Sequence, residues 1–428
     1  MPIKILATGD IHIGRKSTGV PGEPDEISTK HTWQELVGRA IRKGFDALVL
    51  TGDVVDQDNR FFEAVGTLQR GFEKLKEANI EVFIVAGNHD YEVLSQVADA
   101  SKFDNIHLLG ADGKWESCTF RANQMEMKFV GWSFPAKYFY SDPLADLDIP
   151  SSEVPVLGLL HADLDTPESH YAPVDRNHLR SYPVDAWMLG HIHKPDININ
   201  HDPLVAYPGS PHALSPKEQG KHGPLQITIA SKNDIRAELL PISPARYETT
   251  QIDIAGDEDK DQLRKKVVDH ITQFKEDHRN ELEHVRYLVF DLRLTGVHPR
   301  SRDIELWMTQ ITEDLRIEDS SNLLSSVRKV EYDIRPAVKD MAELAKEPSP
   351  AGLMAETILA IEEGSSTPLL ENLLQKWRTG VDRINNAPPY HPLKNTEKLF
   401  ETTDEWGKQE ILTECKKILG ELLNQKNQ

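Results

Sequence analysis

Carboxylate, amide and imidazole side chains recur along the first half of the chain, each directly after a short apolar stretch. These residues are Asp10, His12, Asp53, Asn88, His89, Asp90, His161, His191 and His193. Oxygen and nitrogen donors without a thiolate suit manganese, iron or zinc in expanded coordination better than a structural zinc site. The residue types therefore predict a centre for divalent metal ions.

The apolar stretches before these residues are typical of buried strands. Residues 47–50 have no polar face, as expected of a strand covered on both sides in a parallel sheet, and Gly52 then permits a sharp turn. Asp53 is thereby placed at the carboxyl end of that strand, where open α/β sheets carry their ligand sites. We expect its carboxylate to bridge two metal ions. Strands are also predicted for residues 3–7, 81–86, 156–160 and 186–189.

The segments between these strands predict how the sheets are built. Apolar residues at helical spacing indicate helices over residues 29–43 and 61–77, and this alternation predicts parallel strands with helices outside. From residue 114 the pattern changes, with strands at 116–120 and 126–132. A second, largely antiparallel sheet is expected there.

The motifs D-x-H, G-D-x-x-D, G-N-H-D, H and G-H-x-H occur in this order and resemble those of the calcineurin-like metallophosphoesterases. The resemblance covers roughly the first half of the chain and implies an α/β fold, a four-layer α/β/β/α sandwich. It implies that one ion is held by Asp10, His12, Asp53 and His193. It implies that the other is held by Asp53, Asn88, His161 and His191. His89 would face the phosphate instead of a metal, and Asp90 would orient it.

A second resemblance concerns residues 205–220, which contain Tyr-Pro-Gly-Ser followed by a glutamate. This segment is similar to one in SbcD-type DNA repair exonucleases, the nuclease subunits of double-strand-break repair complexes. The alternative is a proline and glycine turn between two strands. By order and length, residues 1–242 would form the nuclease domain and residues 246–336 an α+β capping domain. Residues 337–428 would form a helical C-terminal region, a possible docking site for a partner.

These motifs predict a metal-dependent phosphodiesterase, with two Mn²⁺ ions the expected cofactors. A hydroxide bridging the ions would attack phosphorus, and His89 would assist the leaving group; Asp56 is expected outside the ligand set. The leading hypothesis is a DNA exonuclease or endonuclease acting in DNA repair. Two alternatives stay open: a small-molecule enzyme such as a cyclic-nucleotide phosphodiesterase, and a catalytically inactive scaffold subunit. An intact ligand set argues against the scaffold.

The charge of the chain bears on its substrate. A formal net charge of -20 is unlike that of a simple nucleic-acid binder, although two divalent ions would make the cleft locally positive. Arg15, Lys16, Arg60 and Lys137 lie near the motif loops. They could contact phosphates or be solvated surface residues.

Location and partners are expected from weaker signals. The two cysteines, Cys118 and Cys415, lie far apart and fit reduced packing residues of a cytoplasmic protein. Neither a secretory signal nor a membrane span is expected. The resemblance implies a homodimer, paired through residues 61–77 and 92–103. An apolar stripe over residues 411–423 either folds back on this chain or docks to an SMC-like ATPase subunit.

Overall fold

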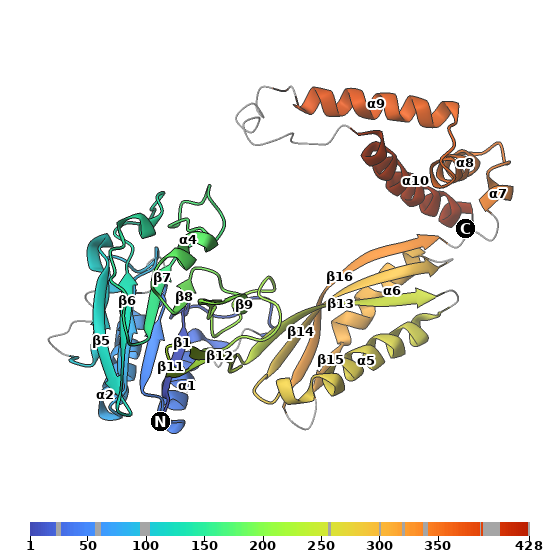
Figure 1. Ribbon diagram of the computed structural model, residues 1–428. Coiled ribbons are helices and arrows are strands. Elements are labelled where there is room, and N and C mark those ends of the chain that lie inside the picture. The colour runs from blue at the N-terminus through green and yellow to red at the C-terminus, as the bar shows by residue number, and fades with distance from the viewer. Residues whose placement is uncertain are drawn as a thin grey trace. The chain divides into compact units, whose positions relative to one another are not determined.

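A computed structural model describes residues 1–22, 27–55, 61–94, 103–255, 258–298, 301–318, 322–336, 341–385, 387 and 403–426 (Figure 1). The chain divides into two compact units. The first contains Met1–Thr249, Phe274–Asp291 and Arg316–Arg328, and the second contains Thr250–Gln273, Leu292–Leu315 and Lys329–Gln428. The three-domain division with boundaries near residues 242 and 336 stays a prediction. Among the described residues, no helix has the length and apolar character needed to cross a bilayer.

The first sheet carries the predicted parallel strands. Its order is β12-β11-β1-β2-β3-β4, with β1 at Ile3–Thr8, β2 at Ala47–Leu50, β3 at Glu81–Ile84, β4 at Ile106–Leu108, β11 at Leu225–Ser231 and β12 at Asp234–Leu239. Strands β1 to β4 are parallel and β11 is antiparallel to β1. Because β1, β2 and β3 are in parallel register, their carboxyl ends meet at one edge of the sheet.

The second sheet has the order β5-β6-β7-β8-β10-β9. Its strands are β5 at Glu116–Ala122, β6 at Met125–Trp132, β7 at Val156–His161, β8 at Ala186–Gly190, β9 at Asp196–His201 and β10 at Leu204–Tyr207. The pairs β6/β7, β7/β8 and β8/β10 are parallel, so the prediction of a largely antiparallel sheet is wrong. The physical reason is the long connections over residues 133–155 and 162–185, which let the chain return in the same direction.

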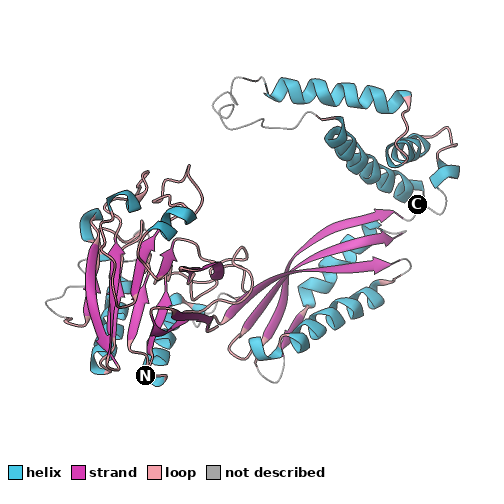
Figure 2. Ribbon diagram, in the orientation of Figure 1, coloured by secondary structure: helices cyan, strands magenta, loops and turns pink. Residues whose placement is uncertain are grey.

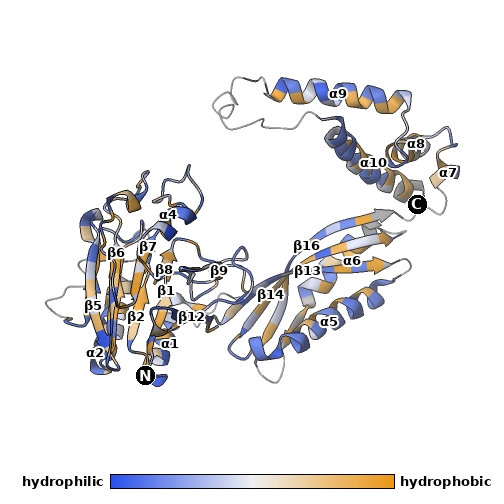
Figure 3. Cartoon of the chain, viewed as in Figure 1, coloured by the Kyte–Doolittle hydropathy of each residue, from blue (hydrophilic) through white to orange (hydrophobic). Residues whose placement is uncertain are grey.

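Within the first unit, sheets and helices are stacked in layers (Figure 2). Buried apolar side chains fill the spaces between these layers. Along β1, Ile3, Ile5 and Ala7 face the core shared by the two sheets, whereas Leu6 faces helices α1 (Thr29–Arg42) and α2 (Phe61–Glu77). A third core lies against the second sheet and includes Leu179 of the short helix α4 (Arg176–Ser181). The hydropathy view shows β2 and β7 as largely hydrophobic (Figure 3).

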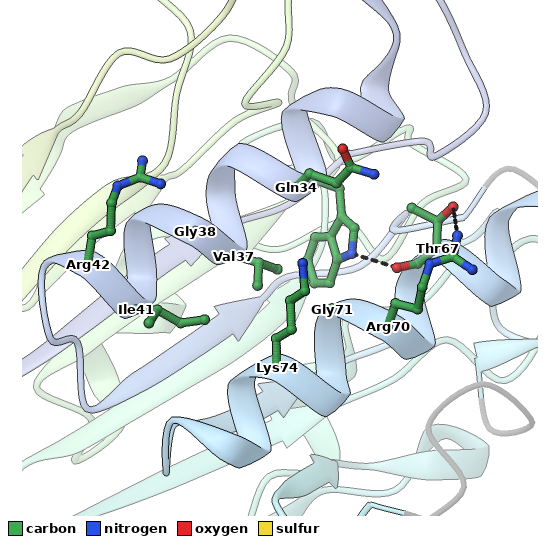
Figure 4. Close-up of a pocket in the computed structure, with 10 residues that line it drawn as sticks. Gln34, Val37, Gly38, Ile41, Arg42, Thr67, Arg70, Gly71 and Lys74 are labelled. Carbon is green, nitrogen blue, oxygen red and sulfur yellow. Dashed lines mark hydrogen bonds between the residues drawn. The ribbon is translucent and has the colours of Figure 1, made fainter.

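Helices α1 and α2 pack through a close approach of backbone to side chain (Figure 4). The indole nitrogen of Trp33 donates to the Thr67 carbonyl at 3.1 Å, and a Cβ at Gly71 would lie 2.4 Å from that nitrogen. Glycine at position 71 therefore allows the contact. Beside it is a pocket of about 270 Å³, whose lining includes Arg42, Arg70 and Lys74 but no predicted metal ligand.

We predict that Gly71→Ala lowers the free energy of unfolding by about 1–3 kcal/mol, because the added methyl group overpacks the buried Trp33. The matched control is Gly66→Ala in the same helix, where a Cβ meets only the Arg70 guanidinium, at 3.6 Å. That change should raise stability by up to about 1 kcal/mol through helix propensity. Urea unfolding measures both, and equal effects of the two substitutions would contradict the packing argument.

The third sheet has the order β13-β14-β16-β15. Its strands are β13 at Ala245–Ala255, β14 at Tyr287–His298, β15 at Arg316–Glu318 and β16 at Leu324–Pro336, and its helices are α5 at Lys260–Asp277 and α6 at Ser301–Asp314. Strands and helices thus both occur within residues 246–336, as expected of an α+β domain.

The last part of the chain is helical, as predicted. It contains α7 (Met341–Leu344), α8 (Pro350–Glu362), α9 (Pro368–Asn385) and α10 (Asp404–Lys426). Cys415 and Leu419 of α10 are buried against Ala355 and Ile358 of α8. The apolar stripe of the final helix therefore folds back on this chain, which is the first of the two alternatives.

Candidate metal centre

The backbone is strained at the strand ends that carry the predicted ligands. Asp10, His12, Asp53 and His191 have φ values of 50°, 47°, 51° and 95°. This left-handed region disfavours residues other than glycine, and such strain gathers at functional sites. Hydrogen bonds hold the strained loops together, since the Asp10 amide donates to the Gly52 carbonyl at 2.9 Å and the His12 amide to the Asp53 carbonyl at 3.0 Å.

Gly52 allows two other motif loops to approach the end of β2. Its φ is 97°, and a Cβ there would lie 2.6 Å from His161 Nδ1 and 2.8 Å from the Gly87 nitrogen. Any larger residue would displace one of these neighbours. Position 52 therefore requires glycine for both its conformation and its surroundings.

One group of possible ligand atoms comes from Asp10, His12 and His193, whose donor atoms lie within 4.8 Å of one another. The Nε2 atoms of His12 and His193 are 3.3 Å apart. The buried Asp10 carboxylate accepts hydrogen bonds from the His191 amide at 3.1 and 3.2 Å. The first and last motifs of the sequence thus meet at one point.

A second group comes from Asp53, His161 and His191, also within 4.8 Å. His161 is fully buried, and its Nδ1 lies 2.9 Å from the Thr51 carbonyl oxygen. Because a carbonyl can only accept, Nδ1 carries the proton and Nε2 keeps its lone pair for a metal. Asn88 Oδ1 lies 3.1 Å from this Nε2. Asn88 and His161 therefore converge as the ligand set requires.

The Asp53 carboxylate lies between the two groups. Its Oδ2 is 4.0 Å from His12 Nε2 and 3.5 Å from His161 Nε2. Its Oδ1 accepts a hydrogen bond from the His89 amide at 2.9 Å. This position suits a carboxylate that serves both groups, and all seven predicted ligands are brought together.

Burial governs the charge states of these groups. It raises the pKa of Asp10 to about 8, partly opposed by the charge of His193, while the charge of Asp53 raises it further. Burial lowers the pKa of His161 to about 3 and that of His191 to about 4. Neutral imidazoles and carboxylates deprived of water fit divalent cations, which need deprotonated ligands and supply the missing positive charge.

Asp90 and His89 lie beside these groups. The Asp90 carboxylate accepts hydrogen bonds from the Val54 amide at 2.7 Å and the Gly87 amide at 2.8 Å, so it joins the loops after β2 and β3. The His89 ring centroid is 5.2 Å from that of His12. That Asp90 orients His89 and that His89 faces a phosphate stay predictions. Asp56 and Arg60 lie outside the described residues.

Three supporting residues are absent from the sequence-derived site. Glu218 Oε1 lies 3.1 Å from His193 Nδ1, and Asp163 Oδ1 lies 3.4 Å from His191 Nε2. The hydroxyl of Tyr207 donates to the Ala162 carbonyl at 2.8 Å and accepts from the Leu164 amide at 3.0 Å. Tyr207 belongs to the Tyr-Pro-Gly-Ser segment, and Glu218 is the glutamate that follows it. This sequence segment is the signal from which both residues could have been predicted.

The hydrogen bond of Glu218 gives this glutamate a definite role. Burial alone lowers the pKa of His193, but the contact with Glu218 and the charge of Asp10 more than offset it, so the pKa is raised. A carboxylate on one ring nitrogen fixes the tautomer and orientation of a ligand histidine. Glu218 is therefore placed to orient His193.

We predict that Asp53→Asn lowers metal occupancy at both groups, because one carboxylate serves two ions, whereas Asp10→Asn mainly empties one. Metal per chain after dialysis against Mn²⁺ measures both effects. Asp175→Asn is the matched control, since Asp175 caps α4 through the Asn177 amide at 2.8 Å and asparagine caps equally well. If the Asp53 variant retains two ions, the assignment of Asp53 as the bridging ligand is wrong.

The chain is similar in sequence to several known proteins. Residues 3–195 match the calcineurin-like phosphoesterase family. The uncharacterized metallophosphoesterase YhaO of Bacillus subtilis is 27% identical over 261 residues, covering 59% of this chain and 63% of that protein. The DNA double-strand break repair protein Mre11 of Methanopyrus kandleri is 20% identical over 292 residues, covering 62% of each. The chain thus matches less than two thirds of the length of either relative.

Among solved structures, a dimetal phosphatase from Danio rerio aligns over 56% of this chain and 99% of its own, with 14% identity and a TM-score of 0.34. The family match spans all the predicted ligands, from Asp10 to His193. The same residues converge on two groups of donor atoms suited to metal ions. Residues 3–195 therefore form a calcineurin-like metallophosphoesterase domain.

Proposed function

We propose that this protein is a two-metal phosphodiesterase that cleaves DNA, as an exonuclease or endonuclease in DNA repair. The main support for two-metal phosphoester hydrolysis is the position of Asp53 between two groups of donor atoms. When bound, two divalent ions would lower the pKa of a coordinated water and neutralise charge on the phosphate. Asp10, His12, Asp53 and His193 would hold one ion, and Asp53, Asn88, His161 and His191 the other.

Side chains and backbone groups of the protein would orient the ligand histidines and supply a proton. The Thr51 carbonyl fixes the tautomer of His161, and Glu218 orients the ring of His193. His89 is half-buried beside His12, where an imidazolium could stabilise developing charge or protonate the leaving oxygen. Such general acid catalysis typically contributes about 10²–10⁴ in rate.

The choice of DNA as substrate rests on two supports. Several relatives are named DNA double-strand break repair protein Mre11, including those of Methanopyrus kandleri and Archaeoglobus fulgidus. The Tyr-Pro-Gly-Ser segment also has a structural use in this chain, because the Gly209 carbonyl accepts from the Gly9 amide at 3.3 Å. This segment, which resembles one in SbcD-type exonucleases, therefore contacts the loop that carries Asp10.

A small-molecule phosphodiesterase is the second candidate, because the metal groups alone do not select a polymer. We propose manganese as the cofactor, since the donors mix carboxylate, amide and imidazole. A cytoplasmic location and a homodimer through α2 and residues 92–103 also stay predictions. Residues 95–102 of that second segment lie outside the described part of the chain.

We predict that His89→Gln keeps both ions yet loses about 10²–10⁴ of the cleavage rate, whereas His191→Gln loses metal as well. Manganese-loaded proteins should be offered single-stranded DNA, hairpin DNA, a cyclic nucleotide and a phosphomonoester in parallel. Cleavage of only the last two substrates by the unchanged protein would refute the nuclease. Loss of metal from the His89 variant would refute the assignment of His89 as a residue that does not bind metal.

An SMC-like ATPase subunit is the partner we propose, and the C-terminal helices are the region proposed to receive it. The stripe on α10 packs on α8, so docking would use the outer faces of this helical group. We predict that a chain ending at Pro336 still cleaves short single-stranded DNA with manganese, but no longer co-purifies with the ATPase. If the truncated protein is insoluble or binds no metal, the C-terminal helices are part of the nuclease fold and the docking proposal is wrong.

A further inference from the structure

A row of aromatic rings leads from a predicted metal ligand to the surface of the first unit. The Tyr171 and His191 ring centroids are 4.7 Å apart, and Tyr138 lies 5.8 Å from Tyr171. Tyr140 follows at 6.2 Å from Tyr138, with His170 at 4.9 Å from Tyr140. We call Tyr138, Tyr140, His170 and Tyr171 the aromatic ledge.

The backbone holds the ledge in place. The Phe139 amide donates to the His170 carbonyl at 2.9 Å, and the Ala172 amide donates to the Phe139 carbonyl at 2.8 Å. Phe139 packs on Trp132 with 4.8 Å between centroids. Because neighbouring residues of an extended segment point to opposite sides, Tyr138 and Tyr140 are directed away from that core.

The ledge presents aromatic surface to solvent next to the metal centre. Tyr138 is 43% exposed and Tyr140 is 64% exposed, and contiguous exposed apolar surface is a feature of interaction sites. Lys137 is exposed and places its amine 5.9 Å from the Tyr138 ring centroid. Aromatic faces next to a cation are the combination that binds unpaired nucleobases and their phosphates.

Three aspartates near the ledge have partners of their own. Asp142 pairs with His178 Nδ1 at 2.5 Å, and Asp165 pairs with Arg176 at 3.0 Å. Asp163 contacts His191, on the side of the metal centre. Lys137 is an exposed cation beside the ledge, so its amine can meet a phosphate.

We propose that the aromatic ledge stacks unpaired bases of a single DNA strand whose scissile phosphodiester lies at the metal centre. The proposal rests on the proposed function and narrows its substrate to strands with accessible bases. Tyr171 places the inner end of the ledge against His191, and Tyr140 forms its exposed outer end. Stacking on these rings accepts any base, since every base has a π-face.

The test compares a labelled oligothymidylate about ten nucleotides long with an abasic strand of equal length. Fluorescence anisotropy in chelator, which prevents cleavage, gives both affinities for four proteins: unchanged, Tyr138→Phe/Tyr140→Phe, Tyr138→Ala/Tyr140→Ala, and Tyr140→Ala alone. The unchanged protein and the phenylalanine variant should prefer the strand with bases. Each ring removed should weaken that strand about fivefold or more, with the abasic affinity unchanged.

The single Tyr140→Ala variant controls for misfolding, because this side chain is 64% exposed and its removal should leave the fold intact. The proposal is overturned if the unchanged protein shows no preference for bases. It is also overturned if alanine variants keep the preference, or if Tyr140→Ala weakens both strands equally. Manganese-dependent cleavage is measured separately. Base preference without cleavage would contradict the proposed nuclease alone, and cleavage without base preference would contradict the ledge alone.

Discussion

Three buried carboxylates within one site set the main physical constraint on this structure. Asp10, Asp53 and Asp90 are almost fully shielded from water. Burial raises the pKa of Asp10 to about 8 and that of Asp90 to about 7, and the charge of Asp53 adds to both shifts. Backbone amides satisfy Asp90. Asp10 and Asp53 face the imidazoles of His193, His12 and His161, an arrangement that positive metal ions would stabilise.

The surrounding loops are built to hold these groups in place. The left-handed conformations of Asp10, His12 and Asp53 cost energy that the surrounding structure must offset, and cross-loop hydrogen bonds contribute to this. Asp90 ties the loop after β2 to the loop after β3, and the Gly209 carbonyl accepts from the Gly9 amide after β1. Tyr207 fixes the loop after β7. The site therefore depends on contacts between segments far apart in sequence.

Local patterns predicted most of the fold and which side chains gather at the strand ends. Buried strands such as Ala47–Leu50 and amphipathic helices such as Phe61–Glu77 follow from apolar spacing, and the ligands follow from motifs after those strands. Strand direction in the second sheet did not follow, because it depends on where the chain goes between β6 and β7. Short or polar strands such as β9 and β12 lack a clear apolar signal. Glu218 and Asp163 gain meaning only through tertiary contacts.

The central claim is that Asp53 serves two metal ions, and anomalous diffraction from crystals grown with Mn²⁺ tests it most directly. We expect two manganese peaks about 3.5–4 Å apart, each in contact with one oxygen of Asp53. We expect Asp10, His12 and His193 around one peak and Asn88, His161 and His191 around the other. A single peak, or two peaks of which only one contacts Asp53, would contradict it.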